Sequence, residues 1–427
     1  MKPSQPYLNL ARDIRSHFVG PDEGASTSDL RVVLYSHDTM GIGHMRRNIL
    51  IASEIKAQFP KASVLVIAGA MEACAFAQNA GIDCLTLPSF SKKPNGTYTS
   101  RNLDIPAGDV LDVRTQTILA TIQSFQPDLF IVDKVACGAG GELLPSLQWL
   151  TKNTDCRCVL GMREILDSPN HVQRDWEKTH SFAVIREHFH SIWIYGDPHV
   201  FNAVEEYEFP DDIANRVIFT GYLNTRSRLN NVKDTSDSQD PYVLCTVGGG
   251  QDGKSLAQHF MESIRETGIN SILLTGPYMP SSTRRMVNSY AANIKALKVI
   301  EFVIEGDVLL KQASQVVSMG GYNTIAAILT HRKPALIVPR VTPRTEQLIR
   351  ARRLADLGLV SSIHPDELTS SAISKWLTRN DNESSAARPS LDMNGLNRIG
   401  EIIQSEFPCV HSRPHFKRKT EVNEHAR

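Results

Sequence analysis

The sequence has no net charge, no long apolar run and no apolar leader. Its 46 lysines and arginines balance its 46 aspartates and glutamates, so no field of the whole protein draws it to nucleic acid or an anionic membrane. No apolar stretch approaches the roughly 20 residues that cross a bilayer. Residues 1–18 lack the apolar segment of a secretory signal peptide. We therefore expect a cytoplasmic protein with no transmembrane segment and no nucleic-acid partner.

Patterns that would hold a metal or a disulfide are also missing. The seven cysteines are scattered, and only Cys156 and Cys158 lie close together, alternating as in a strand. This spacing gives neither a disulfide framework nor a metal site, and free thiols in a reducing compartment are expected. There is no Asp-x-Asp motif, no His/Cys cluster and no nucleophile-elbow motif. The sequence thus predicts no metal and no cofactor.

The sequence does contain a repeated alternation of strand and helix patterns. With 427 residues, 41% of them apolar and 22% charged, the chain is long enough for two soluble domains. Strands alternating with helices predict an α/β fold of two Rossmann-like, doubly wound domains. We divide the chain into a flexible lead-in (1–28), a first domain (29–229), a polar linker (230–240), a second domain (241–410) and a polar tail (411–427).

Three segments stand out within these domains. Pro88–Pro106 is predicted to be a long polar loop, which in a compact domain is usually functional or mobile. His171–Phe189 is predicted to be one long amphipathic helical stretch. Leu391–Phe407 carries apolar residues at helical spacing, and we expect a C-terminal helix there.

The most informative stretch is Gln315–Leu357. An apolar strand, Gln315–Met319, precedes a Gly-Gly turn, and a helix opens at Tyr322. A strand, a glycine turn and a helix N-terminus together form an anion site, because free N–H groups and the positive end of the helix dipole point the same way. A second strand, Ala335–Pro339, leads to polar residues at the same sheet edge, where ligands of open α/β sheets bind.

A second glycine-rich turn, Gly248-Gly249-Gly250, follows the strand Tyr242–Val247. Together the two turns and the polar residues near them predict a site for a phosphorylated ligand, with arginines offering planar donors to phosphate. The residues predicted to form this site are Gly248, Gly249, Gly250, Gly320, Gly321, Asn323, Thr324, Arg340, Arg344, Glu346 and Gln347.

These motifs resemble the donor half of the GT-B glycosyltransferases, above all the family that makes lipid II and a group of bacterial predicted glycosyltransferases. The resemblance implies two domains facing across a cleft, a nucleotide-sugar donor whose diphosphate contacts the glycine turns, and sugar hydroxyls held by Glu346 and Gln347. It also implies that the C-terminal helix crosses back to the first domain. Two positions depart from the pattern. Ala327 replaces a glutamate taken to bind ribose, and Arg344 replaces an acid.

The first strand ends in another glycine-rich turn, which carries Gly41, Gly43 and His44. It is not the dinucleotide fingerprint, because the third glycine and the distal acid are missing. It resembles the Gly-x-Gly-His loop of GT-B enzymes, in which the histidine faces the acceptor. His44 is suited to general-base catalysis, although a merely structural histidine is the alternative, and His37 is a second candidate base.

Carboxylates at other strand ends are candidates for the same cleft. Asp133 ends the strand Leu129–Val132, where it could orient His44, meet the acceptor, cap a helix or pair with Lys134. Glu142 is expected to stabilise a helix N-terminus. Arg163, Glu164 and Asp197 also follow strands, and the sequence does not choose among them.

The sequence therefore predicts an inverting, metal-independent glycosyltransferase that uses a nucleotide sugar, with UDP as the expected nucleotide. The acceptor is left open among a glycan, a lipid carrier and a small molecule. The expected location is the cytoplasm, or the inner face of the membrane. Two alternatives remain: a nucleotide-sugar epimerase or hydrolase, and a non-catalytic nucleotide-sugar-binding subunit.

Overall fold

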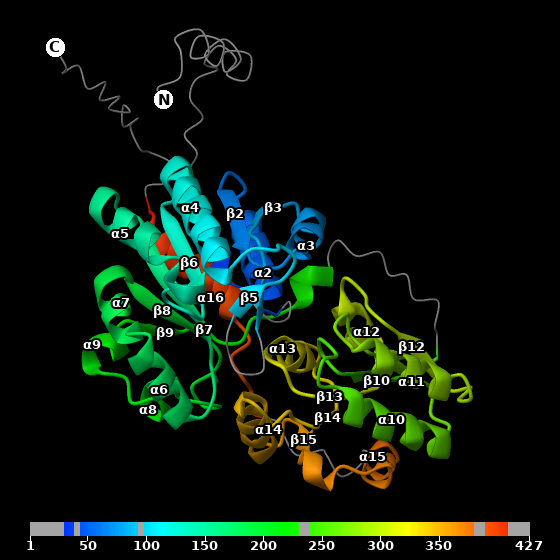
Figure 1. Cartoon of the computed structure of the whole chain (residues 1–427). Helices are drawn as coiled ribbons and strands as arrows, with labels where there is room; N and C mark the ends of the chain where they lie inside the picture. Colours follow the sequence, from blue (N-terminus) through cyan, green and yellow to red (C-terminus); the bar gives the residue numbers. More distant parts are fainter. Residues whose placement is uncertain (1–29, 38–42, 93–97, 230–239, 380–388, 409–427) are drawn as a thin grey trace, which may run out of the picture.

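The computed structural model describes residues 30–37, 43–92, 98–229, 240–379 and 389–408, arranged as two lobes (Figure 1). Among these residues, seven parallel strands form the sheet of the first lobe in the order β3-β2-β1-β6-β7-β8-β9. The strands are β1 (Arg31–Ser36), β2 (Ser63–Ala68), β3 (Asp83–Thr86), β6 (Leu129–Asp133), β7 (Arg157–Arg163), β8 (Ser191–Tyr195) and β9 (Val217–Phe219).

Helices cover both faces of this sheet, as the alternation along β1 shows. Val32 and Leu34 pack into one apolar cluster with α2, while Val33 and Tyr35 pack into another with α4 and α5. The helices are α2 (Gly43–Gln58), α3 (Ala73–Asn79), α4 (Ala107–Phe125), η1 (Ala139–Gly141), α5 (Leu144–Asn153), α6 (Pro169–Lys178), α7 (Ser181–His188), α8 (Ala203–Glu206), α9 (Asp211–Ala214) and η2 (Arg226–Leu229).

The second lobe repeats the plan with a parallel sheet in the order β12-β11-β10-β13-β14-β15. Its strands are β10 (Val243–Thr246), β11 (Ser271–Leu274), β12 (Leu297–Ile300), β13 (Gln315–Ser318), β14 (Ala335–Ile337) and β15 (Ser361–Ser362). Its helices are α10 (Lys254–Thr267), α11 (Ser281–Ala291), α12 (Gly306–Gln312), α13 (Tyr322–His331), α14 (Glu346–Asp356), η3 (Pro365–Glu367) and α15 (Ser370–Leu377). The α/β fold class of two doubly wound domains is confirmed.

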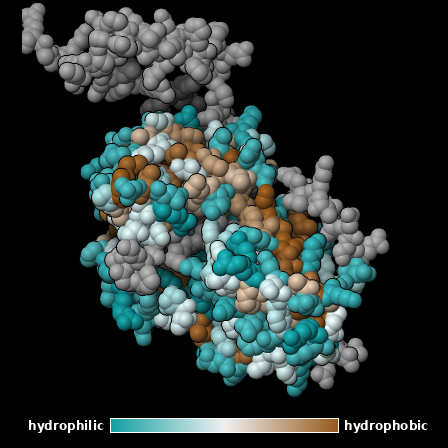
Figure 2. Space-filling view, turned by 45° about the vertical axis from the view of Figure 1, so that its right-hand side comes forward, coloured by the Kyte–Doolittle hydropathy of each residue, from teal (hydrophilic) through white to brown (hydrophobic). Residues whose placement is uncertain are grey.

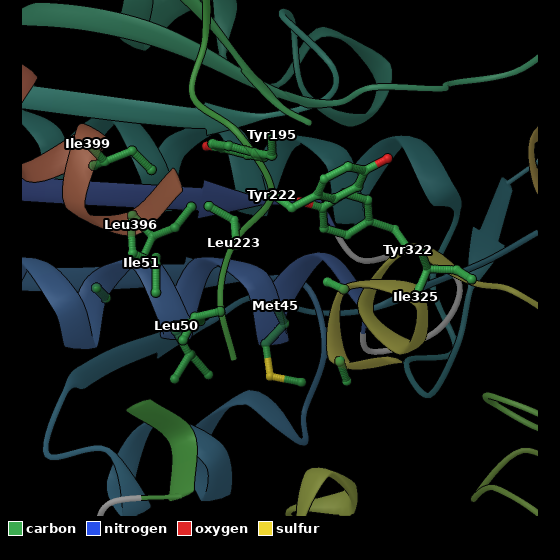
Figure 3. Packing of buried hydrophobic residues seen from close by; sticks show 14 of the residues in the cluster. Met45, Leu50, Ile51, Tyr195, Tyr222, Leu223, Tyr322, Ile325, Leu396 and Ile399 are labelled. Carbon is green, nitrogen blue, oxygen red and sulfur yellow. The ribbon is translucent and has the colours of Figure 1, made fainter. Parts of the chain in front are cut away.

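The last helix, α16 (Gly395–Glu406), lies against the first lobe (Figure 1). Leu396 and Ile399 pack with Leu50 and Ile51 of α2 (Figure 3). The chain therefore crosses back, as expected, and α16 lies apart from the sheet of the second lobe although our division grouped 241–410 together.

Two segments differ from the sequence prediction. The predicted loop 88–106 contains a short antiparallel hairpin, β4 (Phe90–Lys92) and β5 (Tyr98–Ser100). The predicted amphipathic stretch 171–189 forms two helices, α6 and α7, separated at His180, which has a left-handed φ of 49°. The break lets Trp176 and Phe182 meet edge to face at 5.0 Å, a packing of tertiary origin that helical periodicity does not reveal.

The two lobes share one apolar cluster (Figure 3). Met45 of α2, Tyr195 of β8, and Tyr222 and Leu223 of the connecting segment pack with residues of the second lobe. The second lobe contributes Tyr322 and Ile325 of α13, among other residues. The cluster fixes the first turn of α2 opposite the first turn of α13.

Buried charges also join the lobes. Arg350 Nε of α14 donates to Glu164 Oε1 at 2.7 Å, and both side chains are fully buried. Thr345 donates through both its N–H and its hydroxyl to Asp167 Oδ1, at 2.9 and 3.0 Å. The expected lead-in, most of the linker and the tail lie outside the described residues.

Candidate functional site

His44, on the first turn of α2, carries the titratable group of the candidate site. Its Nδ1 contacts Asp133 Oδ2 at the end of β6, where Asp133 is fully buried. Arg47 Nη2 also lies 3.0 Å from Nδ1, but the contact with Asp133 is the shorter. Because a carboxylate can only accept, we assign the hydrogen to Nδ1, which leaves Nε2 as the basic atom. Burial lowers the pKa of His44 to about 4, although Asp133 opposes this shift. His44 is therefore neutral at pH 7, the state that a general base requires.

Arg47, one turn along α2, was not singled out from the sequence. Its Nε and Nη2 donate to Asp133 Oδ1 at 3.0 and 2.5 Å, and its guanidinium lies between the rings of Tyr195 and Tyr322. Burial alone would raise the pKa of Asp133, but Arg47 and then His44 outweigh it and lower that pKa. Asp133 is thus ionised, and its partners are His44 and Arg47 rather than Lys134.

The other members of the predicted acceptor-side loop are placed in part. His37 is buried, and its ring centroid lies 5.1 Å from that of His44. Burial lowers the pKa of His37 well below its usual range, with His44 as a further cause. Gly43 lines the cavity described below, whereas Gly41 lies outside the described residues.

The glycine turn after β10 needs its glycines for backbone reasons. Gly250 has φ 93°, and a Cβ there would lie 2.2 Å from the Thr275 carbonyl oxygen. Gly276, after β11, has φ 80°, and its Cβ would lie 2.3 Å from the Gly248 carbonyl oxygen. Two turns therefore meet at the sheet edge, and the Gly276-Pro277 pair after a strand was the sequence signal for the second.

The turn before α13 divides its roles between two glycines. Gly320 has φ 79°, and a Cβ there would lie 2.7 Å from Ile337, so it shapes the turn. Gly321 has an ordinary φ of −62°, and among the described residues, its chain neighbours aside, no heavy atom lies within 4 Å of a Cβ built on it. Gly321 lines the cavity and Gly320 does not. The open space beside Gly321 lies at the N-terminus of α13.

Polar residues after β14 hold one another in place. Arg340 Nη2 donates to Glu346 Oε1 at 3.0 Å, and the Arg340 N–H donates to Gln347 Oε1 at 3.0 Å. Glu346 is almost fully buried, and its Oε2 has no hydrogen-bond partner among the described residues. Burial would raise the pKa of Glu346, but Arg163 and Arg340 lower it. An ionised carboxylate oxygen is therefore free to accept a ligand hydroxyl.

Two predicted donor-binding residues have other partners. Arg344 faces Asp167 and Asp175 of the first lobe at 4.0 and 3.5 Å and does not line the cavity. Acidic residues on and just before α6 attract it, a juxtaposition that only the tertiary structure creates. Asn323 lines the cavity, but its amide donates to the Gly43 carbonyl oxygen at 2.9 Å and ties α13 to α2.

Glu142 lies just before α5, at a helix start as expected. It is buried and pairs with Arg114, with Nε–Oε2 2.5 Å. Asp197 accepts hydrogen bonds from His199 and Asp392 away from the cavity. Arg163, another residue that the sequence analysis noted after a strand, lines the cavity, and burial lowers its pKa to about 10.

A cavity of about 300 Å³ lies between the lobes and brings these groups together. Predicted site residues that line it are Gly43, His44, Gly248, Gly249, Gly321, Asn323, Thr324, Arg340, Glu346 and Gln347. Asp133 stands behind His44, and Gly250 and Gly320 shape the turns. Within the described ranges no cluster of His, Cys, Asp or Glu could hold a metal ion, and no helix is long and apolar enough to span a membrane.

Comparisons with known proteins agree with this architecture. Residues 243–405 match the model of the glycosyltransferase family 28 C-terminal domain. A UDP-N-acetylglucosamine–N-acetylmuramyl-(pentapeptide) pyrophosphoryl-undecaprenol N-acetylglucosamine transferase of Alkaliphilus oremlandii is 23% identical over 360 residues, covering 81% of this chain and 88% of the relative.

Solved structures are similar in fold. MurG of Acinetobacter baumannii has a TM-score of 0.53 at 15% identity, covering 88% of this chain and 99% of the other. A putative UDP-N-acetylglucosamine 2-epimerase of Listeria monocytogenes has a TM-score of 0.60 at 14% identity, covering 91% and 99%. The protein thus has the fold of the GT-B glycosyltransferases, and its residues 243–405 are similar to the glycosyltransferase family 28 C-terminal domain.

Proposed function

We propose that the protein is a glycosyltransferase that moves a sugar from a nucleotide-diphosphate sugar, first of all a UDP-sugar, to an acceptor hydroxyl. The observation that carries the proposal is that a neutral histidine and two glycine turns line one cavity from opposite lobes. A base on one side and an anion site on the other are the two parts that a sugar transfer between an acceptor and a phosphorylated donor requires.

The proposed chemistry is a single displacement. His44 Nε2 removes the proton of the acceptor hydroxyl, and the acceptor oxygen bonds to the anomeric carbon. The bond from that carbon to the diphosphate oxygen breaks, and the nucleoside diphosphate leaves with the electron pair. One displacement inverts the anomeric configuration. Asp133, held by Arg47, stabilises the imidazolium that forms, because it is a buried carboxylate in contact with Nδ1.

The leaving diphosphate is stabilised by backbone N–H groups and arginines. Gly321 begins α13, where free N–H groups and the helix dipole favour an anion. Arg163 and Arg340 line the same cavity, and guanidinium groups bind phosphate bidentately. These groups support a reaction that needs no divalent metal. Glu346 and Gln347 are placed to hold sugar hydroxyls, with Glu346 Oε2 available as an acceptor.

For the acceptor, a lipid carrier is the first candidate beside a glycan or a small molecule. The relative from Alkaliphilus is named for an undecaprenol-linked acceptor. Apolar side chains gather at the surface near the junction of the lobes (Figure 2). Large exposed apolar residues in the described ranges are Met71, Tyr98, Leu103, Ile105, Val113, Phe302 and Ile304. These features favour action at a membrane surface, and we propose the inner face, which the sequence analysis expects.

The test combines nucleotide binding with transfer. We expect UDP or a UDP-sugar to raise the melting temperature equally with magnesium and with EDTA, because a ligand of the folded state stabilises it by mass action. With UDP-N-acetylglucosamine and a membrane extract as acceptor, His44→Ala should lower transfer by about 100-fold or more and leave UDP affinity within about twofold. His199→Ala, at a side chain that is 87% exposed, is the matched control.

The outcomes separate the candidate functions. Unchanged transfer by His44→Ala would exclude the proposed base. Conversion of the UDP-sugar to its epimer without acceptor would favour the epimerase reading, whose fold the Listeria structure shares. Binding without turnover under all acceptors would favour a non-catalytic subunit, and no nucleotide binding would contradict the donor site.

A further inference from the structure

Beyond the glycine turns, the cavity continues into an apolar section. Leu244 and Leu274 come from neighbouring strands, Phe302 and Val303 from the segment after β12, and Leu310 from α12. Flat apolar walls of this kind suit a nucleobase. We call this apolar section the nucleoside end of the cavity, and the part lined by Gly249 and Gly321, whose N–H groups suit an anion, its phosphate end.

The nucleoside end lacks a carboxylate on α13 but has one on α12. Ala327 of α13 lines the cavity and is buried, so α13 offers a ribose no acidic partner at this position. Asp307 of α12 also lines the cavity and is 6% exposed. The helices α12 and α13 pack against each other. A carboxylate is thus present at this end of the cavity, supplied by the neighbouring helix.

Asp307 lacks a hydrogen-bond partner for one of its oxygens. Its Oδ2 is buried and accepts no hydrogen bond from the described residues. Arg228 Nη1 lies 4.0 Å from Asp307 Oδ1, which is too far for a hydrogen bond. A buried carboxylate oxygen left without a donor destabilises the folded state. The arrangement is therefore unfavourable unless something occupies the space beside it.

Arg228 has a matching donor atom that makes no hydrogen bond among the described residues. Its Nη2 donates to the Arg46 carbonyl oxygen at 3.0 Å, which anchors the guanidinium. Its Nη1 is buried without a hydrogen bond among the described residues, and Arg228 lines the cavity too. A purely structural ion pair would close the gap between Asp307 and Arg228, because contact would satisfy both groups. A separated pair facing a cavity can instead bind a hydroxyl, which donates to the carboxylate and accepts from the guanidinium.

We propose that Asp307, with Arg228 beside it, binds the ribose hydroxyls of the donor nucleotide in place of a carboxylate on α13. The inference rests on the proposed function, since it names how the same cavity recognises its donor. It assigns the enzyme a ribonucleotide donor rather than a 2′-deoxyribonucleotide one. The ribose lies between the apolar section that takes the base and the glycine turns that take the diphosphate.

The experiment measures how well the protein distinguishes ribose from deoxyribose. Dissociation constants are measured by calorimetry for UDP, 2′-deoxy-UDP and 3′-deoxy-UDP, and for the same forms of ADP, GDP and CDP. Wild type should bind the ribonucleotide about 10-fold or more tightly than at least one deoxy form, because a hydrogen bond to a charged group is lost. In Asp307→Ala and Asp307→Asn that ratio should fall to within about threefold. Glu301→Gln, at a half-exposed carboxylate paired with Arg284, should keep the wild-type ratio.

The outcomes distinguish this inference from the proposed function. If Asp307→Asn binds UDP and keeps the wild-type ratio, Asp307 has a structural role and the inference is wrong, while the donor site stands. If wild type binds ribo and deoxy forms equally, the inference is wrong in the same way. If wild type binds no nucleoside diphosphate, both proposals fail. Melting curves of each variant without nucleotide show whether a loss of affinity reflects loss of fold.

Discussion

At the scale of single residues, His44 shows how burial and charge set the state of a group. Its imidazole lies against a buried carboxylate, which would ordinarily raise its pKa, but Arg47 already neutralises that carboxylate. Burial therefore dominates and lowers the pKa of His44 to about 4. The residue is a neutral base across the physiological range, and its basic Nε2 is set by the contact at Nδ1.

This pKa predicts the acid limb of the reaction. We expect kcat/KM to stay level between pH 7 and 5 and to fall near pH 4, rather than near the usual histidine pKa of 6.5. The His44 ring signals in NMR spectra, assigned with His44→Gln, should likewise not titrate above about pH 5. A titration near pH 6.5 would show that His44 is solvated and not held as described.

The same shift links pH to stability. The pKa is lowered on folding, so the unfolded chain takes up the proton first as the pH falls. The contribution of His44 to the free energy of unfolding is full above about pH 6.5 and is lost as the pH falls toward 4.

At the scale of elements, the turn before α13 separates a glycine needed for the fold from one that leaves room for a ligand. Gly320 is required by its positive φ and by the approach of Ile337. Gly321 is required by neither, because its φ is ordinary and no described residue beyond its chain neighbours lies near its Cβ position. Sequence inspection predicted the turn as a unit, and only the geometry divides it.

Substitution at this turn should separate binding from folding. Gly321→Asp should fold with unchanged or higher stability, because Asp is a favourable N-cap, and should weaken UDP binding about 10-fold or more because its carboxylate faces the diphosphate. Gly321→Ser, a neutral N-cap of similar size, should bind within a few fold of wild type. Calorimetry and melting curves measure both effects. If Gly321→Asp bound UDP as wild type does, the diphosphate would not bind at this turn and the assignment would be wrong.

At the scale of the whole molecule, the lobes are joined by shared apolar packing and by buried charge. Tyr322 of the second lobe lies in one cluster with Tyr195 of the first, and the Glu164–Arg350 pair crosses the boundary without exposure. Removing one partner of such a pair leaves the other charge buried and unpaired. The lobes should therefore unfold together rather than separately.

Two carboxylates facing α14 provide the test. Glu164→Gln should lower the free energy of unfolding by roughly 3–5 kcal/mol, because Arg350 loses a buried counter-ion. Glu206→Gln, which removes the partner of the half-exposed Arg353, should cost no more than about 1 kcal/mol. Urea unfolding followed by tryptophan fluorescence measures both. Equal effects, or two separate transitions in wild type, would contradict a rigid, buried junction.

The sequence by itself determined most of the alternation of strands and helices, the glycine turns after β10 and β13, and the acid at the end of β6. These are local signals: apolar runs fix buried parallel strands, and a glycine between strand and helix fixes a turn. For Asp133 the sequence left several roles open, and pairing with His44 was one of them. Strand ends meet at one edge of the sheet, but the sequence does not determine which side chains touch there.

Only the tertiary structure decided the contacts between residues distant in the chain. Arg344 faces Asp167 and Asp175 of the first lobe. Asp307, Arg228 and Ala327 line the same cavity. Which charged side chains pair depends on their distance and burial once the lobes are packed together. Neither quantity can be read from the spacing of residues along the chain.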